Sequence, residues 1–189
     1  MGGGDKWRIQ IGGSSILERI LDRLRPQCSD VIFNGNSDPG TAARGLHVVM
    51  DSVPDYAGPL AGILAGLDWT AQNAPDIRWM LSVSSDCPFL PRDLVARLHQ
   101  AREAENAQLA CAQSAGRRHH VVALWPVRLR EDLRSAITAE GMYKVHEWTA
   151  RYRLAVAVWD DVPVDPFFNI NTPEDAARAD ELAAEYPQA

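Results

Sequence analysis

The feature that most limits the fold is a series of short runs that are apolar at nearly every position. Six runs lie at 30–33, 46–50, 79–83, 109–112, 121–125 and 154–159. A strand with one face in water alternates apolar and polar residues, whereas an unbroken apolar run is typical of a strand covered on both faces. The runs therefore predict buried strands of a sheet that lies between helices.

Amphipathic stretches separate these runs. Leu60, Ile63, Leu64 and Leu67 have the i, i+3, i+4, i+7 spacing of a helix face, and similar patterns cover 16–24, 94–98 and 129–137. A last helix is expected from Thr172-Pro173-Glu174-Asp175, which offers a cap, a first-turn proline and two acids. This alternation predicts an α/β fold with a doubly wound, mostly parallel, Rossmann-like sheet between helix layers. No linker divides residues 1–189, so we expect a single domain.

Composition, charge and the absence of long apolar runs exclude several classes of protein. The 19 Lys+Arg and 25 Asp+Glu give a net charge of −6, which argues against a nucleic-acid partner. Five acids and one arginine follow Thr172, so the rest of the chain can still take a polyanionic substrate. No apolar run approaches the ~18 residues of a membrane span, and no signal peptide is recognisable. The three widely spaced cysteines read as reduced thiols, so we expect a cytoplasmic protein without a membrane partner.

Ligands of doubly wound sheets bind at the carboxyl ends of strands, so the loops that follow strands are the places to look for chemistry. Asp86 comes just after the run 79–83, in Ser84-Ser85-Asp86-Cys87-Pro88. A carboxylate there can hold Mg²⁺ against a triphosphate, and the alternative is an Asx turn before the proline. The adjacent Cys87 is interpreted as a small packing residue.

Three other segments allow a functional and a structural interpretation. Met1-Gly2-Gly3-Gly4-Asp5-Lys6 can cradle phosphate oxygens with backbone N–H groups and a lysine charge, or it is a loose terminus. Asn34-Gly35-Asn36 can contact a base or ribose, or it is a plain turn. Asp51 and the helix start Gly58-Pro59-Leu60-Ala61-Gly62 can meet an anionic ligand, or they serve capping and close packing.

Two further pairs of polar residues are ambiguous in the same way. Asn169 and Asn171 are two residues apart, so in extended backbone they point the same way. They can orient a metal, a phosphate or a second substrate, or they form a hydrogen-bonded turn before the last helix. His119 and His120 precede the run 121–125, where one of them can face a cleft, or both belong to a basic surface turn. Their spacing does not suit zinc.

The order of these segments resembles the molybdenum cofactor guanylyltransferase family, from Met1 to about residue 180. The pieces Gly58-Pro59-Leu60-Ala61-Gly62 and Asn169-Ile170-Asn171-Thr172-Pro173-Glu174-Asp175 are together the most specific. The resemblance implies transfer of GMP from GTP to the phosphate of molybdopterin, with Mg²⁺ as cofactor and pyrophosphate as product. It also implies other molybdenum-cofactor proteins and apo-molybdoenzymes as partners. A cytidylyl- or sugar-nucleotidyltransferase and a non-catalytic nucleotide-binding module remain alternatives.

The resemblance also implies roles for individual residues. It assigns nucleotide contacts to the glycine loop, a lysine, two strand ends and a helix start: Gly2, Gly3, Lys6, Asn34, Asp51, Gly58 and Gly62. Asp86 corresponds to the magnesium ligand, and Asn169 and Asn171 to an asparagine pair that serves the metal or the pterin side. Lys6 and Asp86 are thus the expected catalytic pair.

Elsewhere the chain departs from the family's pattern. His119 and His120 fall where the family has a His-Pro pair on the pterin side, with Val121 in place of the proline. Tyr143 stands where a Gly-x-Arg-Lys-Val stretch has its arginine. The family opens with an apolar strand and a Leu-Ala-Gly-Gly loop ahead of the residues that correspond to Met1. We therefore expect a missing segment of about 10–20 residues there.

Overall fold

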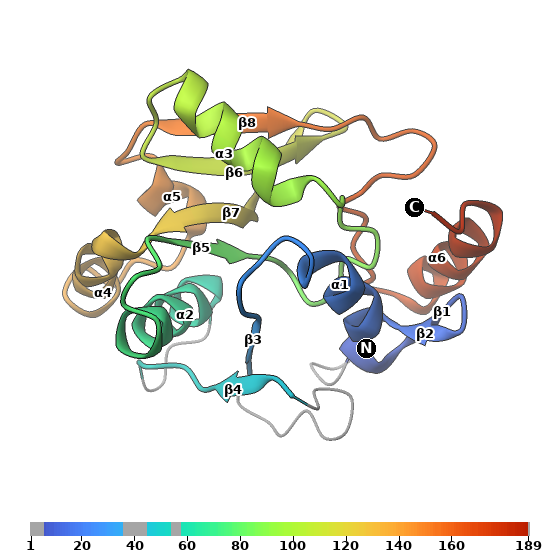
Figure 1. Ribbon diagram of the computed structural model, residues 1–189, viewed down its shortest axis with the longest axis horizontal. Coiled ribbons are helices and arrows are strands. Elements are labelled where there is room, and N and C mark those ends of the chain that lie inside the picture. Colours follow the sequence, from blue (N-terminus) through green and yellow to red (C-terminus); the bar gives the residue numbers. More distant parts are fainter. Residues whose placement is uncertain (1–5, 36–44, 54–57, 189) are drawn as a thin grey trace.

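All six predicted strands are present, and they divide into two groups (Figure 1). The computed structural model describes residues 6–35, 45–53 and 58–188. One group is a parallel pair formed by β3 (Ile32–Asn34) and β4 (His47–Val49). The other is a sheet in the order β5-β7-β6-β8, made of β5 (Trp79–Ser82), β6 (Leu109–Ser114), β7 (Arg117–Pro126) and β8 (Leu154–Val158). A small hairpin of β1 (Gln10–Ile11) and β2 (Ser14–Ser15) is additional to the prediction.

Strand β7 is the antiparallel member of the larger sheet. β6 runs parallel to β8, but β7 runs antiparallel to both of its neighbours, β5 and β6. Its direction follows from the turn, because Ala115 and Gly116 have φ of 47° and 71°, which suits a tight two-residue hairpin. The strand begins at Arg117, so His119 and His120 lie inside it, where the sequence pattern had placed them ahead of it.

Helices cover both faces of the larger sheet, as the unbroken apolar runs predict. They are α1 (Ile16–Leu24), α2 (Pro59–Asn73), α3 (Leu94–Ala104), α4 (Arg130–Thr138), α5 (Val145–Thr149) and α6 (Pro173–Glu185), with 3₁₀ turns η1 (Lys6–Arg8) and η3 (Val127–Leu129). Alternate residues of β6 face opposite layers. Ala110 and Ala112 pack with α1, α3 and α6, whereas Leu109 and Cys111 pack with α2, α4 and α5. The doubly wound α/β class is confirmed.

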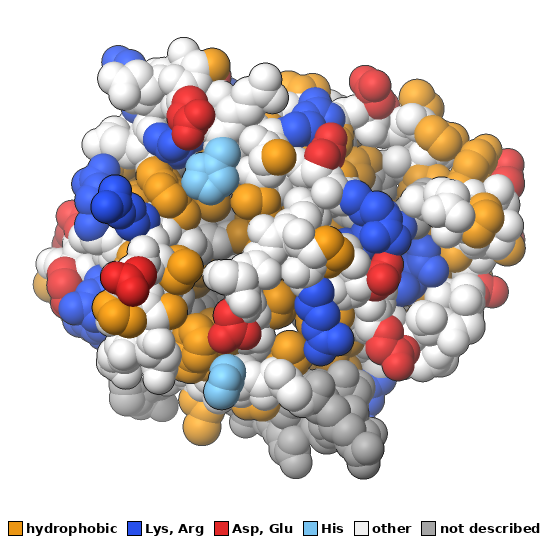
Figure 2. Space-filling model, in the orientation of Figure 1, with side chains coloured by type: hydrophobic (Ala, Val, Ile, Leu, Met, Phe, Trp, Pro, Cys, Tyr) orange, Lys and Arg blue, Asp and Glu red, His pale blue; other side chains and the backbone are white. Residues whose placement is uncertain are grey.

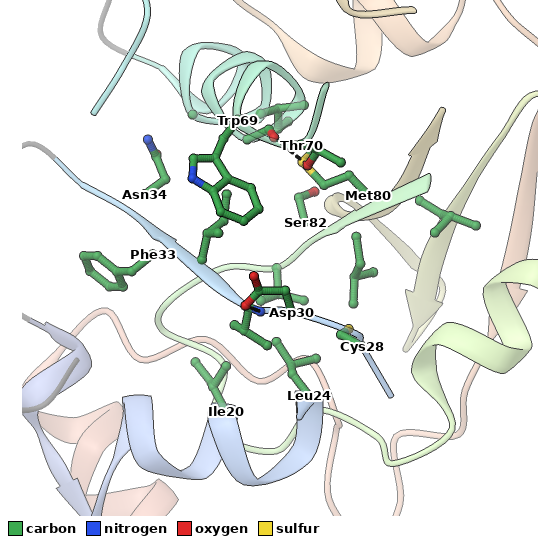
Figure 3. Close-up of a pocket in the computed structure, with 18 of the residues that line it drawn as sticks. Ile20, Leu24, Cys28, Asp30, Phe33, Asn34, Trp69, Thr70, Met80 and Ser82 are labelled. Carbon is green, nitrogen blue, oxygen red and sulfur yellow. Dashed lines mark hydrogen bonds between the residues drawn. The ribbon is translucent and has the colours of Figure 1, made fainter. Parts of the chain in front are cut away.

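An apolar trough of about 530 Å³ separates β3 from β5. Within the described residues, β3 pairs with β4 alone and β5 with β7 alone, so each strand turns an open edge to the trough. Figure 3 shows α1 and α2 on either side of it, with Ile20 and Leu24 below and Trp69 and Thr70 above. The trough is therefore bounded by two strand edges and two helices.

Strands β3 and β5 run in the same direction along this trough: in Figure 3, Asp30 and Phe33 follow one another toward the left, and so do Met80 and Ser82. A methyl group on Gly62 would meet the side chain of Asn34, at the end of β3. One turn later, a methyl group on Gly66 would meet Met80, near the start of β5, and then Ile32, at the start of β3. The starts of the two strands are therefore level, and their carboxyl ends face the same edge of the molecule.

Candidate active site

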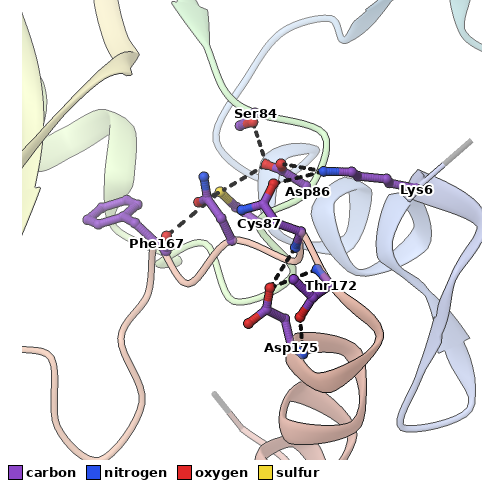
Figure 4. A network of polar contacts seen from close by, with 9 residues as sticks. Lys6, Ser84, Asp86, Cys87, Phe167, Thr172 and Asp175 are labelled. Carbon is purple, nitrogen blue, oxygen red and sulfur yellow. Dashed lines mark hydrogen bonds and ion pairs between the residues drawn. The ribbon is translucent and has the colours of Figure 1, made fainter. Parts of the chain in front are cut away.

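Asp86 lies just beyond the carboxyl end of β5, where the sequence predicts a catalytic group. Its Oδ1 accepts hydrogen bonds from the hydroxyl of Ser84 and, more weakly, from the thiol of Cys87. Its Oδ2 is 3.9 Å from the Nζ of Lys6, and the Asp86 side chain is 15% exposed (Figure 4). A carboxylate held at the surface by a hydroxyl and a cation can still accept a ligand from solvent.

Lys6 links this carboxylate to the predicted asparagine pair. Its Nζ donates a 2.8 Å hydrogen bond to the Oδ1 of Asn171, 165 residues further along the chain. The backbone N–H groups of Asn171 and Thr172 both donate to Asp175 Oδ2, which lowers the pKa of Asp175. The hydroxyl of Thr172 in turn accepts from the N–H of Asp175, so the predicted cap of α6 is a complete capping box. The structure thus brings Lys6, Asp86 and Asn171 together.

Asn169 is held from the interior by Cys87. The thiol, 1% exposed, donates to Asn169 Oδ1 at 2.9 Å, and the N–H of Ile170 donates to the carbonyl of Asp86 at 3.0 Å. Burial raises the pKa of Cys87, so the thiol keeps its proton and stays a donor. The sequence identified Cys87 as a packing residue, which its burial bears out. Its hydrogen bond to Asn169 has no sequence signal.

A second polar cluster lies at the ends of β3 and β4. The Nδ2 of Asn34 donates to the carbonyl of Val49 at 3.1 Å and to Oδ1 of Asp51 at 3.0 Å. A Cβ on Gly62 would come within 2.3 Å of Asn34 Oδ1, so only glycine leaves room for this amide. The structure therefore places Asn34, Asp51 and Gly62 in one contact group.

The trough extends from the second cluster to the residue next to Asp86. Its lining includes Asn34, Asp51, Gly58 and Gly62 at one side and Ser85, next to Asp86, at the other. Gly58 precedes Pro59, the first residue of α2, so the start of this helix opens on the same space. Gly2 and Gly3, predicted to form the phosphate-binding loop, lie outside the described residues.

The two histidines point to different surroundings. His119 Nε2 lies 2.8 Å from the hydroxyl of Ser114, and its ring packs 4.8 Å from that of Phe167. His120 instead faces α5, with its ring 6.0 Å from that of His146. Burial lowers the pKa of both histidines. His119 therefore lies on the side of the 167–171 segment and His120 does not.

The described residues contain no group of three or more His, Cys, Asp or Glu side chains that could hold a metal ion. Asp86 offers one carboxylate, which Cys87 links to the amide of Asn169 and Lys6 links to the amide of Asn171. This donor set fits Mg²⁺, which is usually held by one or two carboxylates together with substrate phosphates. It does not suit a cation that needs an all-protein cage.

The charges on the visible face are mixed. Figure 2 shows Lys and Arg side chains interspersed with Asp and Glu rather than gathered into one basic surface.

Among the described residues, no helix has the length and apolar character to cross a bilayer. A helix-covered α/β sheet with a lysine, a carboxylate and amides at strand ends defines a nucleotide-binding α/β protein.

Comparisons with known proteins show to which family of nucleotide-binding proteins the chain belongs. Residues 1–156 match the family model described as the MobA-like NTP transferase domain. The molybdenum cofactor guanylyltransferase of Nitrobacter hamburgensis is 59% identical over 185 residues, 97% of this chain and 88% of that protein. The protein of the same name from Rhodopseudomonas palustris is 55% identical over 184 residues, with the same coverage of 97% and 88%. The chain belongs to the MobA-like NTP transferase family, and it is a nucleotidyltransferase.

Solved structures show the same fold at lower identity. Molybdopterin-guanine dinucleotide biosynthesis protein A from Archaeoglobus fulgidus matches with a TM-score of 0.71 and 21% identity, over 97% of this chain and 92% of that one. The 2-C-methyl-D-erythritol 4-phosphate cytidylyltransferase from Thermus thermophilus matches with a TM-score of 0.70 and 20% identity, over 96% and 95%. Because both fall under 25% identity, they support the architecture and not the choice of substrate.

Proposed function

We propose that this protein transfers GMP from GTP to the terminal phosphate of molybdopterin, releasing pyrophosphate and forming the guanine dinucleotide cofactor. The observation that carries the proposal is the contact of Lys6 with Asp86 and Asn171, just beyond the end of β5. The relatives named molybdenum cofactor guanylyltransferase support the choice of substrates. We place the enzyme in the cytoplasm, with apo-molybdoenzymes and other molybdenum-cofactor proteins as partners.

The polar residues then divide by the part of the reaction they serve. Lys6 offsets the charge that develops on the leaving pyrophosphate, and Asp86 holds a magnesium ion together with the substrate phosphates. When bound, Mg²⁺ neutralises charge on the reacting phosphates. Asn169 and Asn171 orient the metal or the acceptor phosphate. Phosphoryl chemistry needs this positioning and charge neutralisation more than a covalent intermediate.

The nucleoside end of GTP belongs at the second cluster. Asn34 and Asp51 offer an amide and a carboxylate to the base or ribose, and the α2 start with Gly58 and Gly62 offers N–H groups to phosphate. We assign Gly2 and Gly3, which lie outside the described residues, to phosphate binding as the family resemblance implies. On the acceptor side, the expected pterin contacts are His119 and His120, of which His119 lies beside the 167–171 segment.

The test is pyrophosphate release in the presence of molybdopterin, with GTP or CTP and with or without Mg²⁺. We expect release with GTP and Mg²⁺ at least ~100-fold faster than with CTP or without metal. Omission of molybdopterin is the control, because hydrolysis of GTP alone would release phosphate products without an acceptor. A preference for CTP would identify a cytidylyltransferase. GTP binding without release would identify a non-catalytic nucleotide-binding module.

We also propose that one more strand lies in the trough of the active protein, contributed by a segment ahead of Met1. Its support is the pair of open edges of β3 and β5, which run in the same direction, and the apolar side chains of α1 and α2 around them. An apolar strand there would join the two groups into one sheet. Its following loop would reach the carboxyl ends, beside Lys6. Residues 1–189 and this segment would then form a single nucleotidyltransferase domain.

Extending the chain upstream along its reading frame tests the added strand. We expect the longer chain to unfold at a Tm at least about 10 °C higher and to lose binding of an apolar dye, because the trough is filled. An extension of equal length built from Gly and Ser is the control, and it should leave both properties unchanged. Equal Tm and equal dye binding for the natural extension would contradict the proposal.

A further inference from the structure

Ser114, His119 and Asp165 form a hydrogen-bonded chain outside the polar site described above. Ser114 is the last residue of β6 and is fully buried. Its hydroxyl lies 2.8 Å from His119 Nε2 and donates to Asp165 Oδ1 at 2.7 Å. The same carboxylate oxygen accepts the backbone N–H of Phe167 at 2.9 Å. The hairpin residues Ser114 and His119 are thus linked through Asp165, 51 residues after Ser114, to the backbone of the segment that leads to Asn169.

The order of this chain excludes a nucleophilic triad. In such a triad the imidazole lies between the hydroxyl and the carboxylate and takes the hydroxyl proton. Here the hydroxyl lies between the other two groups, and its one proton points to Asp165. Nε2 of His119 must therefore donate to Ser114, which a neutral ring can do when its single proton is on that nitrogen. A fully buried serine in this position holds its neighbours rather than attacking a substrate.

The chain continues toward Asp86 through the 167–171 segment. Phe167 packs between the rings of His119, at 4.8 Å, and Trp159, at 5.3 Å. Two residues later, Asn169 accepts the thiol hydrogen bond from Cys87, and Ile170 binds the carbonyl of Asp86. The segment that carries both asparagines is therefore fixed at Phe167 by Asp165 and at Ile170 by Asp86.

We propose that Ser114, His119 and Asp165 are positioning residues that hold Asn169 and Asn171 in register with Asp86 and Lys6. The proposal rests on the proposed function for what these asparagines do, but the positioning itself is independent of it. It gives His119 a supporting role, through Ser114 and Phe167, beside the pterin contact proposed above. Side chains that orient polar groups of a metal or phosphate site from behind typically contribute 10–100-fold.

The test compares Ser114→Ala and Asp165→Ala with Asp165→Asn, whose amide oxygen can still accept both hydrogen bonds. Backbone amide exchange at Phe167 and Ile170, measured without substrate, should be about 10-fold faster in Asp165→Ala and near the parent value in Asp165→Asn. In turnover, kcat should fall about 10–100-fold in Asp165→Ala, with the KM for GTP within about twofold. Gln113→Ala and Asp161→Ala, on the same two segments, are the matched controls.

Two results would overturn the proposal. One is unchanged exchange at Phe167 and Ile170 in Asp165→Ala. The other is an Asp165→Asn variant as impaired in kcat as Asp165→Ala, since the hydrogen-bond acceptor would then not be what matters. If the parent protein turns over no GTP at all, the proposed function fails, while the exchange measurement still decides whether the chain positions the segment.

Discussion

Asp86→Asn should lower kcat for pyrophosphate release from GTP about 10³-fold, the size of losing one group that stabilises developing charge. The substitution keeps the shape of the side chain and an oxygen that can accept from Ser84. It removes the negative charge that faces Lys6 and that, in the proposed reaction, would hold Mg²⁺. Because the side chain is near the surface, Tm should move by less than about 4 °C, roughly 1 kcal/mol for a chain of this size.

The matched control for this variant is Asp22→Asn. Asp22 is an exposed carboxylate in an ion pair with Arg92. Exposed ion pairs contribute little to stability, so this variant should keep both its rate and its Tm. Raising Mg²⁺ should restore part of the lost rate in Asp86→Asn, because weaker metal binding is then overcome by mass action. Full activity of Asp86→Asn at limiting Mg²⁺ would reject Asp86 as the metal ligand.

The fold was accessible from the sequence because burial on both faces leaves a direct trace. Leu109 to Ala112 is apolar throughout, and in the structure its residues alternate between two helix layers. Apolar runs carry no information about strand direction, however. The antiparallel course of β7 depends on two residues, Ala115 and Gly116, whose positive φ values permit a tight hairpin. Because this turn ends at Gly116, β7 begins at Arg117 and includes His119 and His120.

The sequence predicts some residues of the candidate site and not others. A residue can be predicted when its own neighbours in the sequence carry a recognisable pattern. Asp86 and Asn171 stand directly after a strand and before a capped helix, so their local context predicts them. Asp165, by contrast, lies in a loop after β8 with no pattern of its own, and its partner Ser114 is 51 residues away. A hydrogen bond between residues so far apart in sequence produces no motif with a recognisable spacing. The trough could not be predicted from the sequence for the same reason, because it depends on which strands pair and the apolar runs do not specify that.

Gly62→Ala should separate nucleotide binding from stability. A new Cβ would lie 2.3 Å from Asn34 Oδ1, so the amide must rotate and give up its hydrogen bonds to Val49 and Asp51. In the interior of a helix, alanine is more favourable than glycine by about 1 kcal/mol, which offsets these exposed bonds. We expect the KM for GTP to rise at least about 10-fold while Tm stays constant or rises slightly.

Gly66→Ala provides the control one helical turn away. Its Cβ would meet the sulfur of Met80 at 2.6 Å, the far end of a flexible side chain that can move without breaking a hydrogen bond. The KM for GTP should therefore stay within about twofold. Asn34→Ala, alone and combined with Gly62→Ala, tests whether the effect passes through the asparagine. If Gly62→Ala acts through Asn34, the double variant should be no worse than either single one, because interacting sites are not additive. Additive losses would mean that Gly62 contacts the nucleotide itself, and that Asn34 is a neighbour rather than the group through which the substitution acts.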